Sequence, residues 1–189
     1  GLVVAGGRLC ANGGFGGQAL GARSGRRLWR PRLVDEATLD ADDGRSSAIT
    51  WLPDGLDINC VAADSSHIVA IAGFGAASTP YPTFVPVPSS TNLACMEAVT
   101  GRVLWQKKPE QFDPEMTDAF WYGRPYVSQG RVYATLRRRQ RTQFQDSYLV
   151  ALDVHSGRTV WKKHLGSVAI GTRQVIPPLA HMVFDEGWI

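Results

Sequence analysis

Three copies of one short segment recur along the chain, and this repeat limits the possible folds more than any other feature. Each copy has a small residue, four further residues, Ser-Gly-Arg or Thr-Gly-Arg, and a tryptophan four positions after the glycine. The copies are ALGARSGRRLW (19–29), CMEAVTGRVLW (95–105) and ALDVHSGRTVW (151–161), with the pairs Gly25/Trp29, Gly101/Trp105 and Gly157/Trp161. Self-similarity of this kind indicates one supersecondary unit used repeatedly.

Each copy reads as a β-hairpin. In the third, residues 148–152 form an apolar strand, Asp153 can start a turn, and Gly157 accepts the positive φ that closes it. A second pair of strands precedes the hairpin, at 125–127 and 131–136 in copy three and at 59–63 and 67–72 in copy two. Copy one is expected to retain only the second strand of that pair, at 2–6. Four short antiparallel strands make a β-propeller blade.

The blade period agrees at two points, because Trp105 and Trp161 are 56 residues apart and Gly130 and Gly187 are 57 apart. We therefore predict an all-β fold of four-stranded blades, about three of a larger ring. We expect the chain 1–189 to be one incomplete propeller segment, with blades near 1–30, 50–110 and 121–166 and the start of another at 175–189. Each repeated tryptophan is expected to fill the interface between neighbouring blades. The remaining blades would belong to the same chain or to another copy.

Composition excludes several classes of protein. Hydrophobic residues make up 44% of the chain and the net charge is +3, so neither a disordered chain nor a nucleic-acid binder is expected. The longest apolar run, about ten residues at 68–77, is far shorter than a membrane span. Cys10, Cys60 and Cys95 are widely spaced and are expected to be small buried residues.

The pattern strand–Asp-x-x-Ser/Thr-Gly-x-x-x-Trp resembles the pyrroloquinoline-quinone (PQQ)-like repeat of quinoprotein propellers. That resemblance implies a periplasmic, envelope or secreted protein. It also leaves two functions open, because the family contains quinone-dependent alcohol dehydrogenases and non-catalytic binding scaffolds. The dehydrogenases use adjacent cysteines, a catalytic aspartate and calcium ligands, and no matching residues are found here. We therefore favour the non-catalytic branch, with no catalytic residue, cofactor or metal; PQQ and calcium are expected only under the dehydrogenase alternative.

Two motif-like segments are interpreted as loops. Residues 14–19 formally match a dinucleotide fingerprint, but a hairpin follows them where a phosphate-binding helix would be needed. The acidic segment at 35–43 lacks the alternation and the distal glutamate of a calcium loop. The four histidines show no ligand spacing and no assignable serine or cysteine partner, so a catalytic triad has no support.

Blade topology points to one candidate binding face in copy three. The loop that enters the blade (118–124) and the loop between its middle strands (137–141) should lie side by side. They would bring together Phe120, Trp121, Tyr122, Arg124, Arg137, Arg138, Arg139 and Arg141. Arginines and aromatic rings together suit a protein partner or an anionic ligand. The alternative is a solvated charged loop beside packed aromatics. A long Pro/Ser loop at 78–91, with Tyr81 and Phe84, is expected on the same face.

Overall fold

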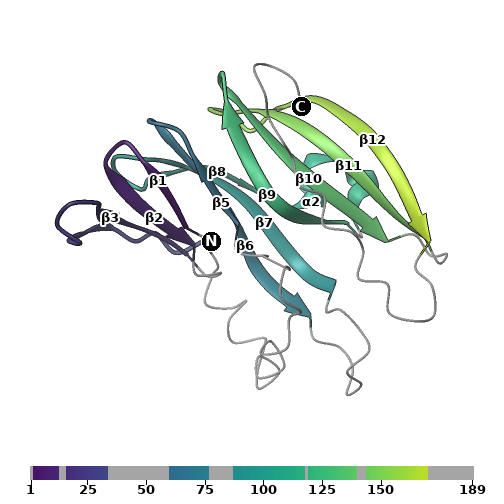
Figure 1. Ribbon diagram of the computed structural model, residues 1–189. Coiled ribbons are helices and arrows are strands. Elements are labelled where there is room, and N and C mark those ends of the chain that lie inside the picture. Colours follow the sequence, from purple (N-terminus) through teal and green to yellow (C-terminus); the bar gives the residue numbers. More distant parts are fainter. Residues whose placement is uncertain are drawn as a thin grey trace.

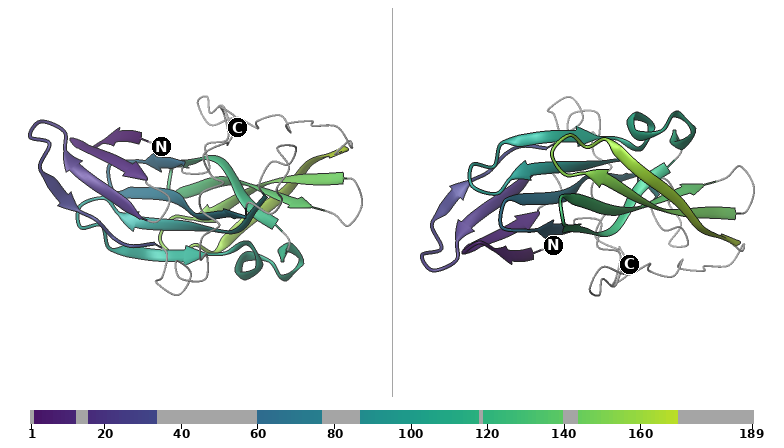
Figure 2. Two further views of the ribbon diagram at one scale, coloured as in Figure 1. Left: turned by 90° about the horizontal axis from the view of Figure 1, so that it is seen from below. Right: turned by 90° about the horizontal axis from the view of Figure 1, so that it is seen from above.

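The computed structural model describes residues 2–12, 16–33, 60–76, 87–117, 119–139 and 144–169. Within them, twelve strands form three separate four-stranded antiparallel sheets, each with its strands in chain order (Figure 1). The all-β propeller fold predicted from the repeat is confirmed. The second sheet lies between the first and the third, and Figure 2 shows the three packed side by side in a row.

The strands are short in the first sheet and longer in the other two. The first contains β1 (Leu2–Ala5), β2 (Arg8–Asn12), β3 (Gly17–Gly21) and β4 (Arg27–Trp29). The second contains β5 (Val61–Ala63), β6 (His67–Ala76), β7 (Val87–Glu97) and β8 (Val103–Lys107). The third contains β9 (Ala119–Ser128), β10 (Arg131–Arg139), β11 (Phe144–Asp153) and β12 (Thr159–Ala169). A short helix, α2 (Pro109–Phe112), and a 3-10 turn, η2 (Pro114–Met116), join the second sheet to the third. We call the three sheets blades 1, 2 and 3.

The expectation that copy one retains only one inner strand was wrong. Leu2–Ala5 is the first strand of a complete blade and pairs with Arg8–Asn12, with Val3 opposite Cys10. Gly6 and Gly7 both have positive φ, 54° and 73°, which allows a two-residue turn to join the strands. This glycine pair was the local signal for the missed hairpin.

Four segments predicted as loops are partly strand. The first is 14–19, because β3 begins at Gly17. β9 already begins at Ala119 and β10 runs to Arg139, so most of 118–124 and the first part of 137–141 lie within the blade 3 sheet. β7 begins at Val87, inside the predicted Pro/Ser loop. Tyr81, Phe84, Arg141, the acidic segment at 35–43 and the further blade start at 175–189 lie outside the described residues.

The core consists of two layers, one in each space between neighbouring blades. β6 contributes to both because successive side chains of a strand point to opposite faces. Ile68 packs toward blade 1 with Cys10 and Ala94, whereas Val69 packs toward blade 3 with Trp121. A strand covered on both faces needs apolar side chains at consecutive positions, which accounts for the buried run at residues 68–72.

The repeated tryptophans join one blade to the next across these layers. A Cβ atom on Gly101 would lie 2.5 Å from Cδ2 of Trp29, and one on Gly157 would lie 2.7 Å from Cδ2 of Trp105. The indole nitrogens donate to backbone carbonyls of the next blade, Trp29 to Ala98 at 3.1 Å and Trp105 to Val154 at 2.8 Å. Trp29 and Trp105 therefore each cover the glycine turn of the following blade, and each donates to the carbonyl three residues before that glycine. We call this contact the tryptophan–glycine contact.

Candidate functional site

The candidate face lies where β9 begins and β10 ends, and the strand register brings its residues together. Phe120 is opposite Arg137, Trp121 is opposite Leu136 and Tyr122 is opposite Thr135. Adjacent residues of a strand alternate between the two faces of the sheet, so Trp121 points away from Phe120 and Tyr122. The face predicted as one cluster is thus divided between the two sides of blade 3.

Trp121 belongs to the core between blades 2 and 3. Its side chain is fully buried, its backbone N–H donates to Thr91 Oγ1 at 2.7 Å, and its indole Nε1 donates to the Lys107 carbonyl at 3.0 Å. The Phe112 ring of helix α2 lies edge-on to it, with centroids 6.0 Å apart. Its backbone N–H and its indole N–H both donate within the fold, so Trp121 positions β9 against blade 2 and is not available to a ligand.

Tyr122 and Arg137 form a stacked pair on the other side of the sheet. The guanidinium carbon of Arg137 lies 3.9 Å from the centroid of the Tyr122 ring, and the residues are 4% and 5% exposed. Burial lowers the pKa of Arg137, and burial raises the pKa of Tyr122 although the Arg137 charge opposes that rise. The hydroxyl oxygen of Tyr122 is buried without a hydrogen-bond partner. The pair is a fixed cationic and aromatic element beneath the surface.

The accessible part of the predicted set is smaller. Arg124 is exposed and follows Gly123, which has a φ of 73°, at the register shift between β9 and β10. Arg138 is half-buried and lies opposite Asp146 of β11. Arg139 ends β10. The structure therefore brings Phe120, Tyr122 and Arg137 together, whereas Arg124 is exposed and Arg138 is half-buried.

A polar cluster beside Arg138 was missed at the sequence level. Asp146 is 3% exposed and accepts a hydrogen bond from Ser167 Oγ at 2.5 Å and another from the Tyr148 hydroxyl at 3.4 Å. His164 Nε2 lies 3.6 Å from Asp146 Oδ1. The spacing of Asp146 and Tyr148 by two along a strand was a usable signal, but β11 was predicted to begin at Tyr148. His164 and Ser167 join them only through the pairing of β11 with β12.

The cluster contains serine, histidine and aspartate without the geometry of a catalytic triad. A triad needs the carboxylate on one ring nitrogen and the serine on the other. Here Nε2 of His164 faces both groups, at 3.3 Å from Ser167 Oγ and 3.6 Å from Asp146 Oδ1. The serine also donates directly to the carboxylate. The cluster instead supplies hydrogen-bond partners to the buried Asp146 carboxylate near the candidate face.

The connector between blades 2 and 3 is fastened to β12 by an ion pair between Asp113 and Lys162. The hydrogen bond from Lys162, with a further one from the backbone of Glu115, lowers the pKa of Asp113. A lowered folded-state pKa means that the pair stabilises the fold above the unfolded pKa, close to 3.8, and that this contribution is lost as the pH falls through the folded value.

We therefore expect Lys162→Met to be less stable than the natural protein near neutral pH, with the difference vanishing at low pH. The measurement is the urea midpoint between about pH 7 and pH 2. Arg158→Met, a change in the same strand region at an exposed arginine without an ion pair among the described residues, is the control. A stability difference for Lys162→Met that stays constant with pH would contradict the assignment.

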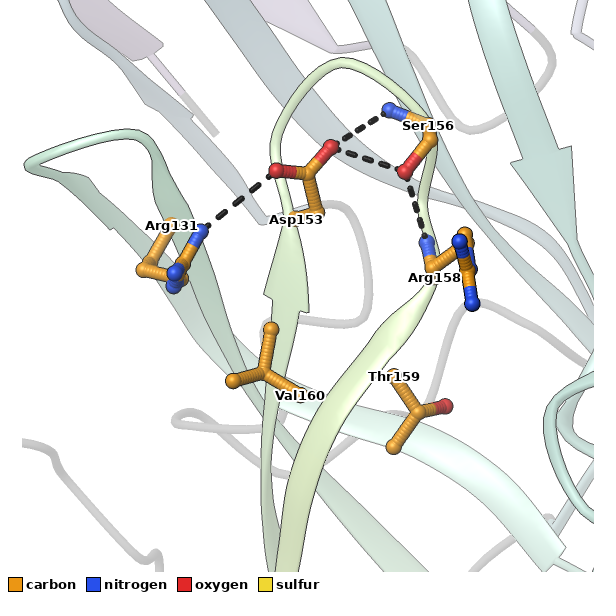
Figure 3. A pocket seen from close by; sticks show the side chains of 6 residues that line it. All are labelled: Arg131, Asp153, Ser156, Arg158, Thr159 and Val160. Carbon is orange, nitrogen blue, oxygen red and sulfur yellow. Dashed lines mark hydrogen bonds and ion pairs between the residues drawn. The ribbon is translucent and has the colours of Figure 1, made fainter.

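A shallow hollow surrounds the blade 3 hairpin turn (Figure 3). Asp153 Oδ1 accepts from the backbone N–H of Ser156 at 2.9 Å and from its hydroxyl at 2.7 Å, while Oδ2 lies 3.4 Å from Arg131. These hydrogen bonds lower the pKa of Asp153. The polar groups of this hollow build the turn itself.

The three cysteines are buried, as expected. Cys10, Cys60 and Cys95 are each at most 3% exposed, and no disulfide joins them among the described residues. Burial raises the pKa of Cys95 to about 12. Across the described ranges, no three histidine, cysteine, aspartate or glutamate side chains are grouped to hold a metal ion, and no helix is long and apolar enough to cross a membrane.

The fold is shared with known quinoprotein structures. The chain superimposes on a europium-containing methanol dehydrogenase with a TM-score of 0.52 and 16% identity, covering 87% of this chain and 24% of that one. It also matches quinohemoprotein alcohol dehydrogenase ADHIIG from Pseudomonas putida HK5 (TM-score 0.54, 20% identity, 86% and 20% covered). A third match is quinohemoprotein alcohol dehydrogenase from Comamonas testosteroni (0.54, 19%, 86% and 20%). The chain thus spans about a quarter or less of each structure. No curated protein matches its sequence.

Four-stranded antiparallel blades joined by tryptophan–glycine contacts define a quinoprotein-type β-propeller. Residues 17–184 match the PQQ-like repeat family model described as outer membrane protein assembly factor BamB. The chain belongs to this family, and the resemblance stated from the repeat is confirmed.

Proposed function

We propose that the protein is a non-catalytic scaffold that binds a protein partner or an anionic ligand at the strand ends of blade 3. The observation that carries the proposal is the buried stack of Arg137 on Tyr122. Half-buried Arg138 follows Arg137 in the strand and lies on the opposite face of the sheet. Stacking on the Tyr122 ring holds the Arg137 guanidinium in one orientation. Arg124 and Arg138 would make the direct contacts.

We also propose that further blades, in the same chain or another copy, complete the ring in the periplasm, the cell envelope or a secreted form. Two features support further blades. Gly25 has a φ of 64° and, among the described residues, nothing within 4 Å of an added Cβ, unlike Gly101 and Gly157. Trp161 is half-buried, and among the described residues its ring lies against Tyr133 of its own blade, with centroids 6.0 Å apart.

Site-specific photocrosslinking tests the binding face. A photoreactive amino acid at Arg124 or Arg138 is expected to give a discrete adduct in cells that produce the protein, whereas one at exposed Gln129 in the β9–β10 turn is not. Arg124→Ala and Arg138→Ala should reduce adduct formation at the other position several-fold and change stability by less than about 0.5 kcal/mol. The proposal would be contradicted if the adduct yield at Gln129 equalled that at Arg124 and Arg138. It would also be contradicted if neither alanine substitution lowered the yield at the other position.

Arg137 needs a different treatment because it is buried. Arg137→Ala removes a desolvated cation–π contact and the packing of a long side chain, so it is expected to destabilise the fold by about 2 kcal/mol. Arg138→Ala, one residue further along the same strand, is its control. Urea denaturation followed by circular dichroism separates these outcomes.

The alternative is that the chain is part of a quinone-dependent alcohol dehydrogenase. The fold that it shares with three dehydrogenase structures supports this alternative. Pyrroloquinoline quinone and calcium would be added to the protein, with absorbance and dye-linked alcohol oxidation as readouts. The scaffold proposal expects neither binding nor turnover. Bound cofactor with turnover would establish the alternative.

A further inference from the structure

The outer hairpin of blade 1 has several exposed arginine side chains. Arg23, Arg26, Arg27 and Arg30 are all exposed. None of the four forms an ion pair within the described part of the chain. We call these four residues the arginine edge. It lies in a different blade from the face under Proposed function and does not depend on that proposal.

Two of the equivalent cations in the other blades form ion pairs. Arg102 occupies the place of Arg26 in blade 2, and its Nε lies 3.9 Å from Glu97 Oε2. Blade 1 has Gly21 where blade 2 has Glu97, so no carboxylate is available at that turn. Lys162 occupies the place of Arg30 in blade 3 and pairs with Asp113. Arg158, the equivalent of Arg26 in blade 3, also forms no ion pair among the described residues. Blade 1 differs from the other described blades because four such arginines lie on one outer hairpin.

The arginine edge coincides with an open strand edge. β4 is the last strand of its sheet and pairs with β3 through Arg27 opposite Leu20 and Trp29 opposite Ala19. Its other side has no strand within the described residues. Leu28, between two of these arginines, is 49% exposed. An edge strand presents backbone N–H and C=O groups that another extended chain can pair with.

We propose that β4 is a docking edge for an extended acidic segment of a partner protein. The segment would add to the blade 1 sheet as a further strand, with its carboxylates on the arginine edge and an apolar side chain on Leu28. Guanidinium groups bind carboxylates through two parallel hydrogen bonds, which suits this chemistry. Another extended chain can pair along a strand edge through both N–H and C=O groups, whereas lipid headgroups and nucleic-acid phosphates cannot form such a ladder. Charge complementarity and the open edge together favour a peptide.

The test uses a fluorescent peptide of alternating glutamate and valine, with binding measured by fluorescence anisotropy. Replacing Arg26, Arg27 and Arg30 together with alanine is expected to weaken binding by roughly tenfold, since exposed charge pairs each contribute a few-fold. The same peptide with proline in place of valine keeps the charge but cannot pair as a strand, so it should also bind several-fold more weakly. Arg102→Ala, the equivalent position in blade 2, should leave binding unchanged.

Three results would overturn the proposal. The first is equal binding by the triple alanine variant or equal loss with Arg102→Ala. The second is equal binding of the proline peptide, which would show that no strand is added. The third is tighter, arginine-dependent binding to phosphatidylglycerol vesicles than to the peptide, which would assign the surface to lipid. A triple lysine variant guards against a folding defect: it retains the charge and should bind more tightly than the alanine variant, and equally weak binding would count against the proposal.

Discussion

Gly157→Ala is expected to destabilise the protein by roughly 3–4 kcal/mol, because two separate costs add at this position. The backbone has a φ of 64°, which is unfavourable for alanine, and the new Cβ would lie 2.7 Å from Cδ2 and 3.0 Å from Cγ of Trp105. The indole cannot move away freely, since its Nε1 is bonded to the Val154 carbonyl. Blades 2 and 3 would have to separate to accommodate the methyl group.

Gly130→Ala is the matched control for the backbone cost. Gly130 has a φ of 72° but nothing within 4 Å of an added Cβ. This variant should lose only about 1–2 kcal/mol, the cost of the left-handed conformation. Urea denaturation of both variants, followed by circular dichroism, measures the difference. Equal losses would mean that close packing of the tryptophan contributes nothing at Gly157.

Trp105→Ala is expected to cost about 4 kcal/mol, in the range for truncating a large buried aromatic side chain. The indole is 8% exposed, packs in the core between blades 2 and 3, and donates to Val154 at 2.8 Å. Its loss removes the side chain that fills the inter-blade space and leaves the Val154 carbonyl without its partner. The expected result is a large fall in the urea midpoint.

Trp161→Ala tests whether position in the repeat alone sets this cost. Trp161 occupies the same place in blade 3 but is half-buried, so its truncation should cost less than half as much. Trp105→Phe separates the two parts of the contact, because phenylalanine keeps a ring but cannot donate; about 1–2 kcal/mol is expected from the unmade hydrogen bond. Equal losses at Trp105 and Trp161 would show that Trp161 is also packed against another blade.

The tryptophan–glycine contact also explains why the repeat has its particular residues. Glycine is needed at the turn both for its positive φ and for the space above it, and tryptophan is needed for its flat ring and its single donor. Cysteine or alanine at the start of each copy, Ala19 and Cys95, is buried opposite the tryptophan in the strand pairing. Larger side chains there would displace the indole from the interface.

The repeat determined the blades because a hairpin is a local structure. Ser or Thr, Gly and Trp at fixed spacing specify a turn and its two strands without reference to the rest of the chain, and the four-stranded unit followed from their order. The missed β1–β2 hairpin was also local, at Gly6 and Gly7, and required only that two consecutive glycines be read as a turn. The extent of β9 and β10 was harder to predict from the sequence, since arginines at 137–139 are as compatible with a loop as with a strand.

The surroundings of the candidate residues were decided by tertiary structure. Alternation along β9 could place Trp121 and Tyr122 on opposite faces, but only the packing of blade 2 against blade 3 made Trp121 a core residue. Burial of Arg137 on Tyr122, and the meeting of Asp146 with His164 and Ser167, depend on strand register over tens of residues. The sequence by itself therefore determined the unit, its turn chemistry and its period, because these depend on neighbours along the chain. Only the tertiary structure decided which tryptophan contacts which glycine and which arginines remain exposed, because those outcomes depend on how one blade covers the next.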